Sequence, residues 1–217
     1  MTARCTGVIL AGGLATRYGG LPKGLERVDG RRVVDRVADA LAATTDELLL
    51  IANDPAARDW LPGTRVAGDA RPGLGSLGGI HAALVRAGTP VLVVAWDMPF
   101  VSAPLLAELR ALGETADAAV PESDSRRGVE PLCAYYAPAC VAPIERRLDA
   151  GDLRVIGFYD DVRVARLAAD RVRRHGDPAR LFMNVNTPGE LALAERHARE
   201  QPASATDGGD RRRQASG

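Results

Sequence analysis

Residues 6–23 read Thr-Gly-Val-Ile-Leu-Ala-Gly-Gly-Leu-Ala-Thr-Arg-Tyr-Gly-Gly-Leu-Pro-Lys. The first five residues form a short apolar run stopped by glycines, which is typical of a buried strand. A glycine-rich turn after such a strand lets backbone N–H groups approach phosphate oxygens, and Arg17 and Lys23 add positive charge there. We therefore interpret this stretch as a strand followed by a phosphate-binding loop.

The lysine in this loop stands out from the composition of the chain. Of the 28 basic residues, Lys23 is the one lysine, and all the others are arginines. A lysine carries a compact ammonium on a thin stem, whereas an arginine carries a planar fork. A single lysine kept inside a glycine-rich loop favours a phosphate contact over a chance surface position.

Strands and helices alternate along the rest of the chain. We expect strands at 47–52, near 66, at 90–96, 116–120 and 130–136, and helices at 34–43, before 60, and at 80–87, 105–112, 139–148 and 191–199. This alternation predicts an α/β domain with a mostly parallel sheet and helices on both faces. The domain is expected to span residues 1–199. Residues 200–217 hold no large apolar side chain to bury, which predicts a disordered polar tail.

Composition excludes several classes of protein. Apolar residues make up 46% of the chain and charged residues 26%, values typical of a globular protein. The 28 basic residues balance 28 acidic ones, so no net positive field favours nucleic-acid binding. No apolar run approaches the roughly 20 residues of a membrane span. We expect a cytoplasmic protein with neither a nucleic-acid nor a membrane partner.

The cysteines and histidines are expected to have no chemical role. Three cysteines fit neither a disulfide framework nor a metal site, which predicts reduced thiols. Cys133 and Cys140 are expected in the core. We expect the histidines at helix or loop surfaces: His81, His175 and His197.

Polar residues follow several of the expected strands. Asn53 and Asp97 come directly after two of them, and Asp69 lies near a third. In an open parallel sheet, ligands bind beyond the carboxyl ends of the strands, so these side chains should converge on one crevice with the first loop. Asp97 offers the hard oxygen ligand for Mg²⁺ that a nucleoside triphosphate needs. The structural alternatives are a helix cap for Asp97 and turn roles for Asn53 and Asp69.

Two other phosphate-binding motifs do not fit. Lys23 is preceded by a proline and followed by a glycine, whereas a P-loop needs Gly-Lys-Ser/Thr entering a helix. Residues 73–78 match Gly-x-Gly-x-x-Gly, and Asp97 lies about twenty residues further on, as a dinucleotide-binding motif requires. Asp69 and Pro72 nevertheless interrupt the path from strand to glycines, and this reading leaves Lys23 unexplained. A nicotinamide-dependent dehydrogenase is therefore disfavoured.

The ordered set of motifs resembles the molybdenum cofactor guanylyltransferases. Leu10-Ala-Gly-Gly13 with Arg17, Gly19 and Lys23 is similar to the loop signature of that family. The similarity continues through Asn53, Asp69, Gly75-Ser-Leu-Gly-Gly79, Asp97-Met-Pro99, Glu130-Pro-Leu132 and Asn184-Val-Asn-Thr-Pro188. It covers about residues 6–199. One departure is Ser76, where family members usually carry proline, and it leaves room for an altered base pocket.

The resemblance implies a single Rossmann-like nucleotidyltransferase domain that transfers GMP from GTP to molybdopterin and releases pyrophosphate. The implied nucleotide-binding residues are Leu10, Ala11, Gly12, Gly13, Lys23, Asn53, Asp69 and Asp97. The implied catalytic residues are Lys23, Asp97 and Arg17, with Asp97 also the ligand of Mg²⁺. Asn184 and Asn186 would lie near the reacting phosphates or the pterin substrate. Transient contact with molybdoenzymes or their chaperones is a further implied partnership.

Two alternatives to the guanylyl reaction stay open. One is another nucleotidyltransferase, which would use CTP on molybdopterin or take a sugar or alcohol phosphate as acceptor. The Leu-Ala-Gly-Gly start and the Asn-Val-Asn-Thr-Pro segment favour the guanylyl reading. The other is a nucleotide-binding regulatory subunit without turnover, against which the intact Lys23 and Asp97 argue.

Overall fold

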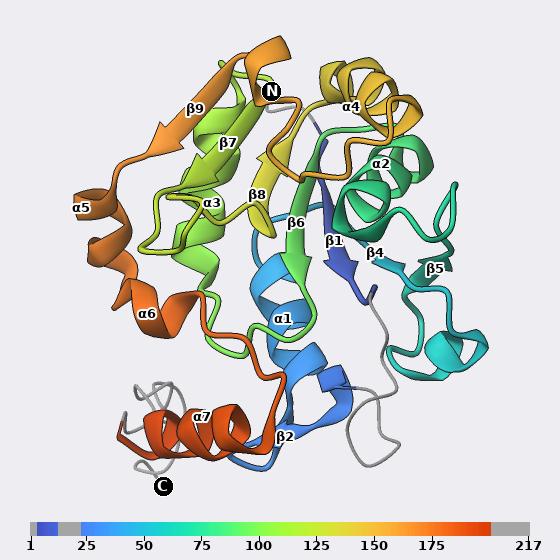
Figure 1. Ribbon diagram of the computed structural model, residues 1–217. Coiled ribbons are helices and arrows are strands. Elements are labelled where there is room, and N and C mark those ends of the chain that lie inside the picture. The colour runs from blue at the N-terminus through green and yellow to red at the C-terminus, as the bar shows by residue number, and fades with distance from the viewer. Residues whose placement is uncertain (1–3, 13–22, 201–217) are drawn as a thin grey trace, which may run out of the picture.

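A seven-stranded sheet runs through the computed structural model, which describes residues 4–12 and 23–200 (Figure 1). Its strand order is β5-β4-β1-β6-β8-β7-β9. The strands are β1 (Thr6–Leu10), β4 (Glu47–Ile51), β5 (Arg65–Ala67), β6 (Val91–Ala95), β7 (Ala118–Pro121), β8 (Cys133–Tyr136) and β9 (Val164–Leu167). Every neighbouring pair is parallel except those that include β8, which runs against both β6 and β7. The mostly parallel sheet predicted from the alternation of elements is confirmed.

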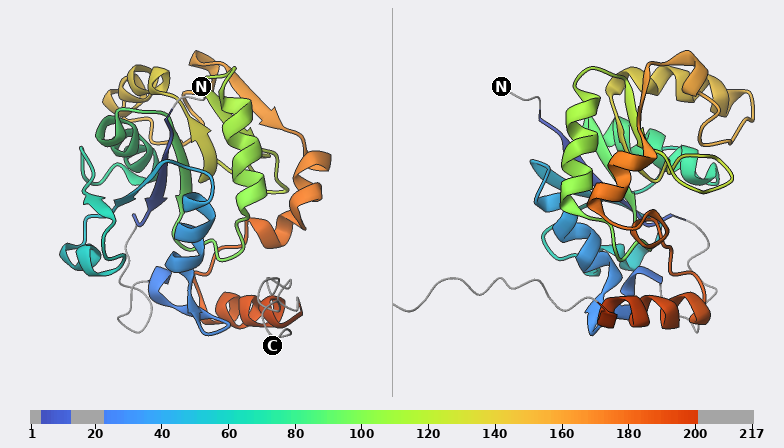
Figure 2. Two further views of the ribbon diagram at one scale, coloured as in Figure 1. Left: turned by 180° about the vertical axis from the view of Figure 1, so that it is seen from behind. Right: turned by 90° about the vertical axis from the view of Figure 1, so that its left-hand side faces the viewer.

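Helices cover both faces of this sheet, as predicted (Figure 2). The helices are α1 (Val33–Ala42), α2 (Gly75–Ala87), α3 (Ala103–Gly113), α4 (Val141–Asp149), α5 (Ala169–Val172), α6 (Pro178–Leu181) and α7 (Pro188–Glu200). Ile9 of β1 packs into the core beneath α1 and α3, whereas Val8 and Leu10 pack into the core beneath α2 and α4. Successive side chains of a strand point to opposite faces, so one buried strand supplies both cores.

The path of the chain places a topological switch between β1 and β6. From β1 the chain passes through α1 to β4 and β5, and then returns through α2 on the opposite face to β6. The strands end together, since Leu10 is paired with both Ile51 and Ala95, and Ile51 with Ala67. The residues that follow these four strands therefore emerge in one row at the carboxyl edge, where α/β sheets bind ligands.

The reversed strand β8 brings a further segment to the same edge. Because β8 is antiparallel, the residues that lead into it lie at the carboxyl ends of its neighbours, and Ala95 N–H donates to the Leu132 carbonyl at 2.9 Å. The buried Tyr136 hydroxyl donates to the Pro131 carbonyl at 2.8 Å. The same hydroxyl lies 2.9 Å from the hydroxyl of Tyr159. This buried side chain holds the segment that enters β8.

We expect Tyr136→Phe to lower the free energy of unfolding by about 1–3 kcal/mol, because it leaves buried polar groups without a partner. Urea unfolding measures this change as a lower midpoint at constant slope. Tyr159→Phe is the matched control: it keeps the bond to Pro131 and should cost less. Equal midpoints for wild type and Tyr136→Phe would contradict the prediction.

A small hairpin and the last helix contribute to a small hydrophobic cluster that is separate from the two main cores. In the hairpin of β2 (Arg27–Val28) and β3 (Arg31–Arg32), Asp29 and Gly30 have φ of 52° and 73°, the left-handed turn that the Asp-Gly pair predicts. Helix α7 contacts β2. Thr187 Oγ1 accepts a bond from Glu190 N–H at 3.2 Å, the N-cap contact that a threonine three residues before a glutamate favours. The helix ends at Glu200, one residue beyond the expected domain boundary. Residues 201–217 of the expected tail lie outside the described residues.

Two expectations for the α2 region are wrong. The helix begins at Gly75 rather than at Ile80, so the glycine turn is its first turn. Close packing explains Gly78, because a Cβ there would lie only 2.8 Å from Leu74, whereas a Cβ on Gly79 would make an ordinary contact with Leu10 at 3.5 Å. His81 is buried, with 4% of its surface exposed, and its Nε2 lies 3.0 Å from Glu145 Oε1. Helix α2 packs against β1, β4 and β6 and also against its neighbour α4, which carries Glu145.

Several short elements had no sequence signal. Helices α5 and α6 have four residues each, and one turn is too short to show a helical period. Edge strand β9 is interrupted by the exposed Arg166 and so lacks a continuous apolar run. The 3-10 helices of the described residues are η1 (Lys23–Leu25), η2 (Pro55–Asp59), η3 (Pro138–Cys140), η4 (Tyr159–Asp161) and η5 (Arg173–His175). Of these, η2 corresponds to the short helix expected before residue 60.

The cysteines are core thiols, as predicted. All three are buried, and burial raises the pKa of Cys5 to about 11 and that of Cys140 to about 12. The thiols therefore stay protonated at neutral pH. Within the described ranges, none of the helices combines the length and the apolar character of a membrane span.

Candidate functional site

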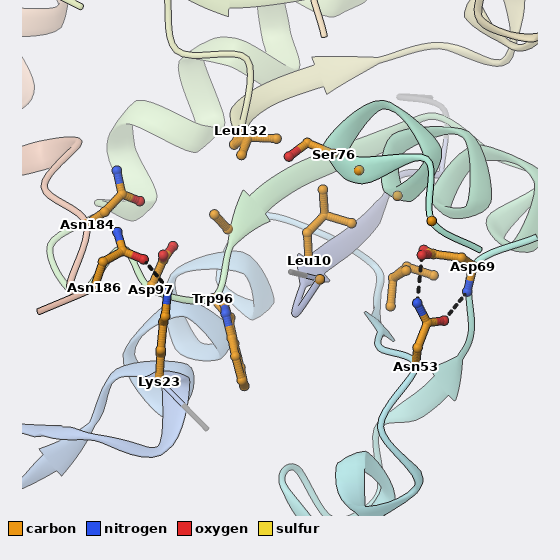
Figure 3. Close-up of a pocket in the computed structure, with 16 residues that line it drawn as sticks. Leu10, Lys23, Asn53, Asp69, Ser76, Trp96, Asp97, Leu132, Asn184 and Asn186 are labelled. Carbon is orange, nitrogen blue, oxygen red and sulfur yellow. Dashed lines mark hydrogen bonds between the residues drawn. The ribbon is translucent and has the colours of Figure 1, made fainter. Parts of the chain in front are cut away.

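A cavity of about 660 Å³ opens at the carboxyl edge of the sheet, at the switch point between β1 and β6 (Figure 3). This volume falls within the range typical of small-molecule sites. The predicted residues that line it are Leu10, Gly12, Lys23, Asn53, Asp69, Asp97, Asn184 and Asn186. Segments that lie far apart in the sequence therefore converge on one crevice, as the strand-end argument predicted.

One end of the cavity holds the positive charge and a half-buried carboxylate. Lys23 Nζ donates to Asn186 Oδ1 at 2.7 Å. The backbone N–H of Val185 donates to the Asp97 carbonyl at 2.9 Å, which fixes the Asn-Val-Asn segment against the end of β6. Asn184, on the other side of Val185, lines the same end (Figure 3). We call Lys23, Asp97, Asn184 and Asn186 the charged end.

Burial sets the electrostatics of Asp97. It raises the pKa of this half-buried carboxyl above its ordinary value, while the Lys23 ammonium lowers the pKa in part. Burial also raises the pKa of Glu130, in the segment before β8, and the charge of Asp97 adds to that rise. A bound cation stabilises the charged form of a carboxylate that has lost hydrating water and has no strong ion pair.

The opposite end of the cavity holds an amide–carboxylate pair. Asn53 Nδ2 donates to Asp69 Oδ2 at 2.7 Å, and the Asp69 backbone N–H donates to Asn53 Oδ1 at 2.8 Å. These two bonds orient the Asp69 carboxylate and leave lone pairs on it for a ligand. Figure 3 shows the pair at the far side of the cavity from Lys23. We call Asn53 and Asp69 the paired end.

The first turn of α2 lines the cavity between these two ends. Gly75, Ser76 and Gly79 contribute to its wall, and Ser76 replaces the proline usual in the family that the motifs resemble. The unpaired N–H groups and the dipole at the start of a 13-residue helix favour an anion there. The earlier start of α2 therefore places the first N–H groups of a helix, rather than a turn ahead of it, along the cavity wall.

Three predicted loop residues stand apart from the rest. Ala11 does not line the cavity, and its backbone N–H donates to the Ile51 carbonyl at 2.9 Å, so only its carbonyl is left for a nucleotide. Gly13 and Arg17 lie outside the described residues. Sequence reasoning missed Trp96, which lines the cavity. Its position directly before Asp97 was the available signal.

The residues at the charged end fit a magnesium ion held jointly with a substrate. In the part of the chain that the structure describes, no group of three or more His, Cys, Asp or Glu side chains could hold a metal. Mg²⁺ is usually bound by one or two carboxylates together with substrate phosphates and water. Asp97, a single hard oxygen donor facing a cavity of nucleotide size, matches that mode.

Comparison with known families agrees with this architecture. Residues 7–167 match the model of the MobA-like NTP transferase domain. The chain belongs to the MobA-like NTP transferase family. The matched stretch runs from β1 to β9 and includes both ends of the cavity except the Asn184–Asn186 segment.

Relatives of this MobA-like chain carry consistent names. It is 37% identical over 193 residues to the molybdenum cofactor guanylyltransferase of Desulfosudis oleivorans, covering 88% of this chain and 94% of the relative. It is 38% identical over 196 residues to that of Cereibacter sphaeroides, covering 88% and 96%. The crystal structure of molybdopterin-guanine dinucleotide biosynthesis protein A from Archaeoglobus fulgidus aligns with a TM-score of 0.76 at 28% identity, covering 90% of this chain and all of that one. The nucleotidyltransferase fold and the family resemblance are confirmed.

Proposed function

We propose that this protein transfers GMP from GTP to molybdopterin and releases pyrophosphate. The observation that carries the proposal is the two-ended cavity: an ammonium and a half-buried carboxylate at the charged end, and an oriented acceptor at the paired end. The names of the relatives in the MobA-like family support the same reaction.

The paired end suits a guanine base. Guanine presents an N1–H and an exocyclic N2–H₂ group on one edge, and a carboxylate can accept from both. Asp69, held by Asn53, offers such a carboxylate at a fixed orientation. Cytosine and adenine have an unprotonated ring nitrogen beside their amino group. This ring nitrogen is an acceptor, so it could not donate to the carboxylate. Each polar group left unpaired in this way costs about 1–3 kcal/mol.

The charged end suits the triphosphate. The Lys23 ammonium has three donors, of which Asn186 accepts one, so two are left for phosphate oxygens. The start of α2 adds backbone donors between the two ends. A phosphate oxygen of molybdopterin would attack the α-phosphorus of GTP while the bond to the β-phosphate oxygen breaks. Lys23 would stabilise the charge that grows on the α-phosphate and on pyrophosphate, and the fixed donors would keep the phosphates in line.

Asp97 would hold Mg²⁺ at the charged end. When bound, the ion neutralises negative charge on the phosphates and orients them. Asn184 and Asn186 contact the same end and would lie beside the acceptor phosphate. The alternative reactions share this end, because CTP or another acceptor needs the same phosphate chemistry. The two nucleotides differ at the paired end.

Base choice provides the test of this assignment. We expect kcat/KM for GTP to exceed that for CTP and ATP by at least about tenfold, the factor for roughly 1.4 kcal/mol. Pyrophosphate release would be measured with molybdopterin, Mg²⁺ and each of four nucleotides. Asp69→Asn replaces an acceptor by a donor and should reduce the preference for GTP, whereas the exposed Asp59→Asn should not.

Two results would contradict the proposal. Efficiency with CTP equal to or above that with GTP would favour the cytidylyl alternative and leave the roles of Lys23 and Asp97 intact. Release of no pyrophosphate from any nucleotide would favour a regulatory subunit.

A further inference from the structure

Trp96 holds the start of the glycine-rich segment through its backbone. It follows β6 directly, and its N–H donates to the Leu10 carbonyl at 3.1 Å. Leu10 is the last residue of β1, so this bond fixes the point where the segment leaves the sheet. The side chain is buried, with 3% of its surface exposed, yet it contributes to the cavity wall.

The indole ring of Trp96 holds the other end of that segment. A Cβ built on Gly24 would lie 2.4 Å from Cε3 and 2.7 Å from Cδ2 of Trp96, so the Gly24 backbone lies directly on the ring. Real Cβ atoms do not approach other atoms this closely, and these two ring atoms do not belong to the far end of a flexible side chain that could shift at little cost. Gly24 follows Lys23, so the ring also sets where Lys23 enters the cavity (Figure 3).

A second tryptophan keeps this ring in place. Trp60 stacks on Trp96 with ring centroids 5.0 Å apart and planes inclined by 25°. Trp60 directly follows the 3-10 helix η2, which begins two residues after Asn53. Stacked aromatic pairs add stability beyond the area they bury. The stacked pair therefore connects Trp96, next to Asp97 of the charged end, to the segment that follows Asn53 of the paired end.

We propose that Trp96 is a positioning residue that sets Lys23 in register with the rest of the nucleotide site. It does so by holding both flanks of the glycine-rich segment: the Leu10 carbonyl with its backbone and the Gly24 backbone with its ring. The catalytic consequence rests on the proposed function, because it requires that Lys23 contact the phosphates. The placement of Lys23 itself does not depend on the substrate.

Chemical labelling tests that placement without any nucleotide. Lys23 is the one lysine of the chain, so an amine-reactive reagent labels it and the α-amino group alone, and mass spectrometry separates the two. Gly24→Ala forces the backbone off the ring and should take Lys23 Nζ away from Asn186. We expect labelling of Lys23, relative to the α-amino group, to rise about fivefold, the factor for one ordinary hydrogen bond.

A matched glycine variant controls for the added methyl group. In Gly189→Ala the new Cβ would meet nothing closer than Thr187 Oγ1 at 4.0 Å, so labelling and kcat/KM should equal those of wild type. Trp96→Leu should reproduce the labelling of Gly24→Ala, and Trp96→Phe, which keeps an aromatic surface under Gly24, should recover part of the loss. Thermal unfolding identifies any variant that fails to fold. If Trp96→Leu fails to fold, Trp96→Phe replaces it in the labelling experiment.

The catalytic consequence has its own readouts. We expect Gly24→Ala to lower kcat/KM for GTP by about 10- to 100-fold, the scale for a misplaced reacting group. The chain has two tryptophans, and the Trp60→Phe variant leaves only Trp96, whose emission should change when GTP and Mg²⁺ bind. The Trp96→Phe variant leaves only Trp60, which does not line the cavity, and should show no change.

The outcomes separate this inference from the proposed function. Wild-type labelling of Lys23 in both Gly24→Ala and Trp96→Leu would overturn the inference, whatever the activity. Increased labelling in a protein that does not transfer GMP would support the placement of Lys23 by Trp96 and overturn the proposed function instead.

Discussion

Asp97→Asn is expected to reduce turnover by about 100-fold or more while the fold stays intact, the scale for losing one well-placed charge-stabilising group. The amide has nearly the size of the carboxylate but carries no charge to hold Mg²⁺. The backbone bond from Val185 N–H to the Asp97 carbonyl is untouched by the change. Because burial raises the pKa of the carboxyl, removal of its charge should leave the stability equal or slightly higher.

The measurement is pyrophosphate release from GTP over a series of Mg²⁺ concentrations. The exposed Asp59→Asn makes the same chemical change outside the cavity and should behave as wild type. Near-wild-type turnover of Asp97→Asn at ordinary Mg²⁺ would reject the metal assignment. A lower apparent affinity for Mg²⁺ without loss at saturation would restrict Asp97 to metal binding.

Lys23→Ala is expected to reduce turnover by about 100-fold, because the growing phosphate charge loses its nearest ammonium. Lys23→Arg should recover little of this loss although it keeps the charge. The planar guanidinium cannot take the place of the compact ammonium that donates to Asn186 at 2.7 Å.

Single-turnover rates with GTP and Mg²⁺ measure the loss. Arg58 is exposed, so Arg58→Lys is a matched control that should leave the rate unchanged. Amine labelling gives independent evidence, since GTP with Mg²⁺ should protect Lys23 from the reagent. A normal rate for Lys23→Arg would make the single lysine an accident of composition.

Periodicity was enough to predict the main elements of the sheet and their layers. Buried strands such as Thr6–Leu10 and Val91–Ala95 are short apolar runs with a glycine or a proline near one end, and α1 has one apolar face. These signals are local, so they are visible in the chain itself. Strand β9 and the one-turn helices α5 and α6 lack them, because an edge position or a length of four residues leaves no period.

The direction of β8 is not encoded in its own apolar pattern. The run Cys133–Tyr136 reads the same whether it pairs parallel or antiparallel with β6. Its direction decides that Leu132 lines the cavity rather than lying at the opposite edge. Only the pairing with neighbours settles that choice.

The sequence by itself determined which residues are available at the carboxyl ends of the strands. Lys23, Asn53, Asp69 and Asp97 follow strand or loop signals, and the parallel alternation of elements sends those ends to one edge. The chemistry expected of them depends on residue type, which the sequence states directly.

Only the tertiary structure decided how these residues are paired and oriented. The contacts Lys23–Asn186, Asn53–Asp69 and Gly24–Trp96 join segments that separate strands and helices bring together. Such contacts depend on distance in space, and sequence patterns report only neighbours along one strand or one helix turn. The same reason explains His81: its burial comes from α4, which lies about 60 residues further along the chain and packs on α2 because both helices cover one face of the sheet.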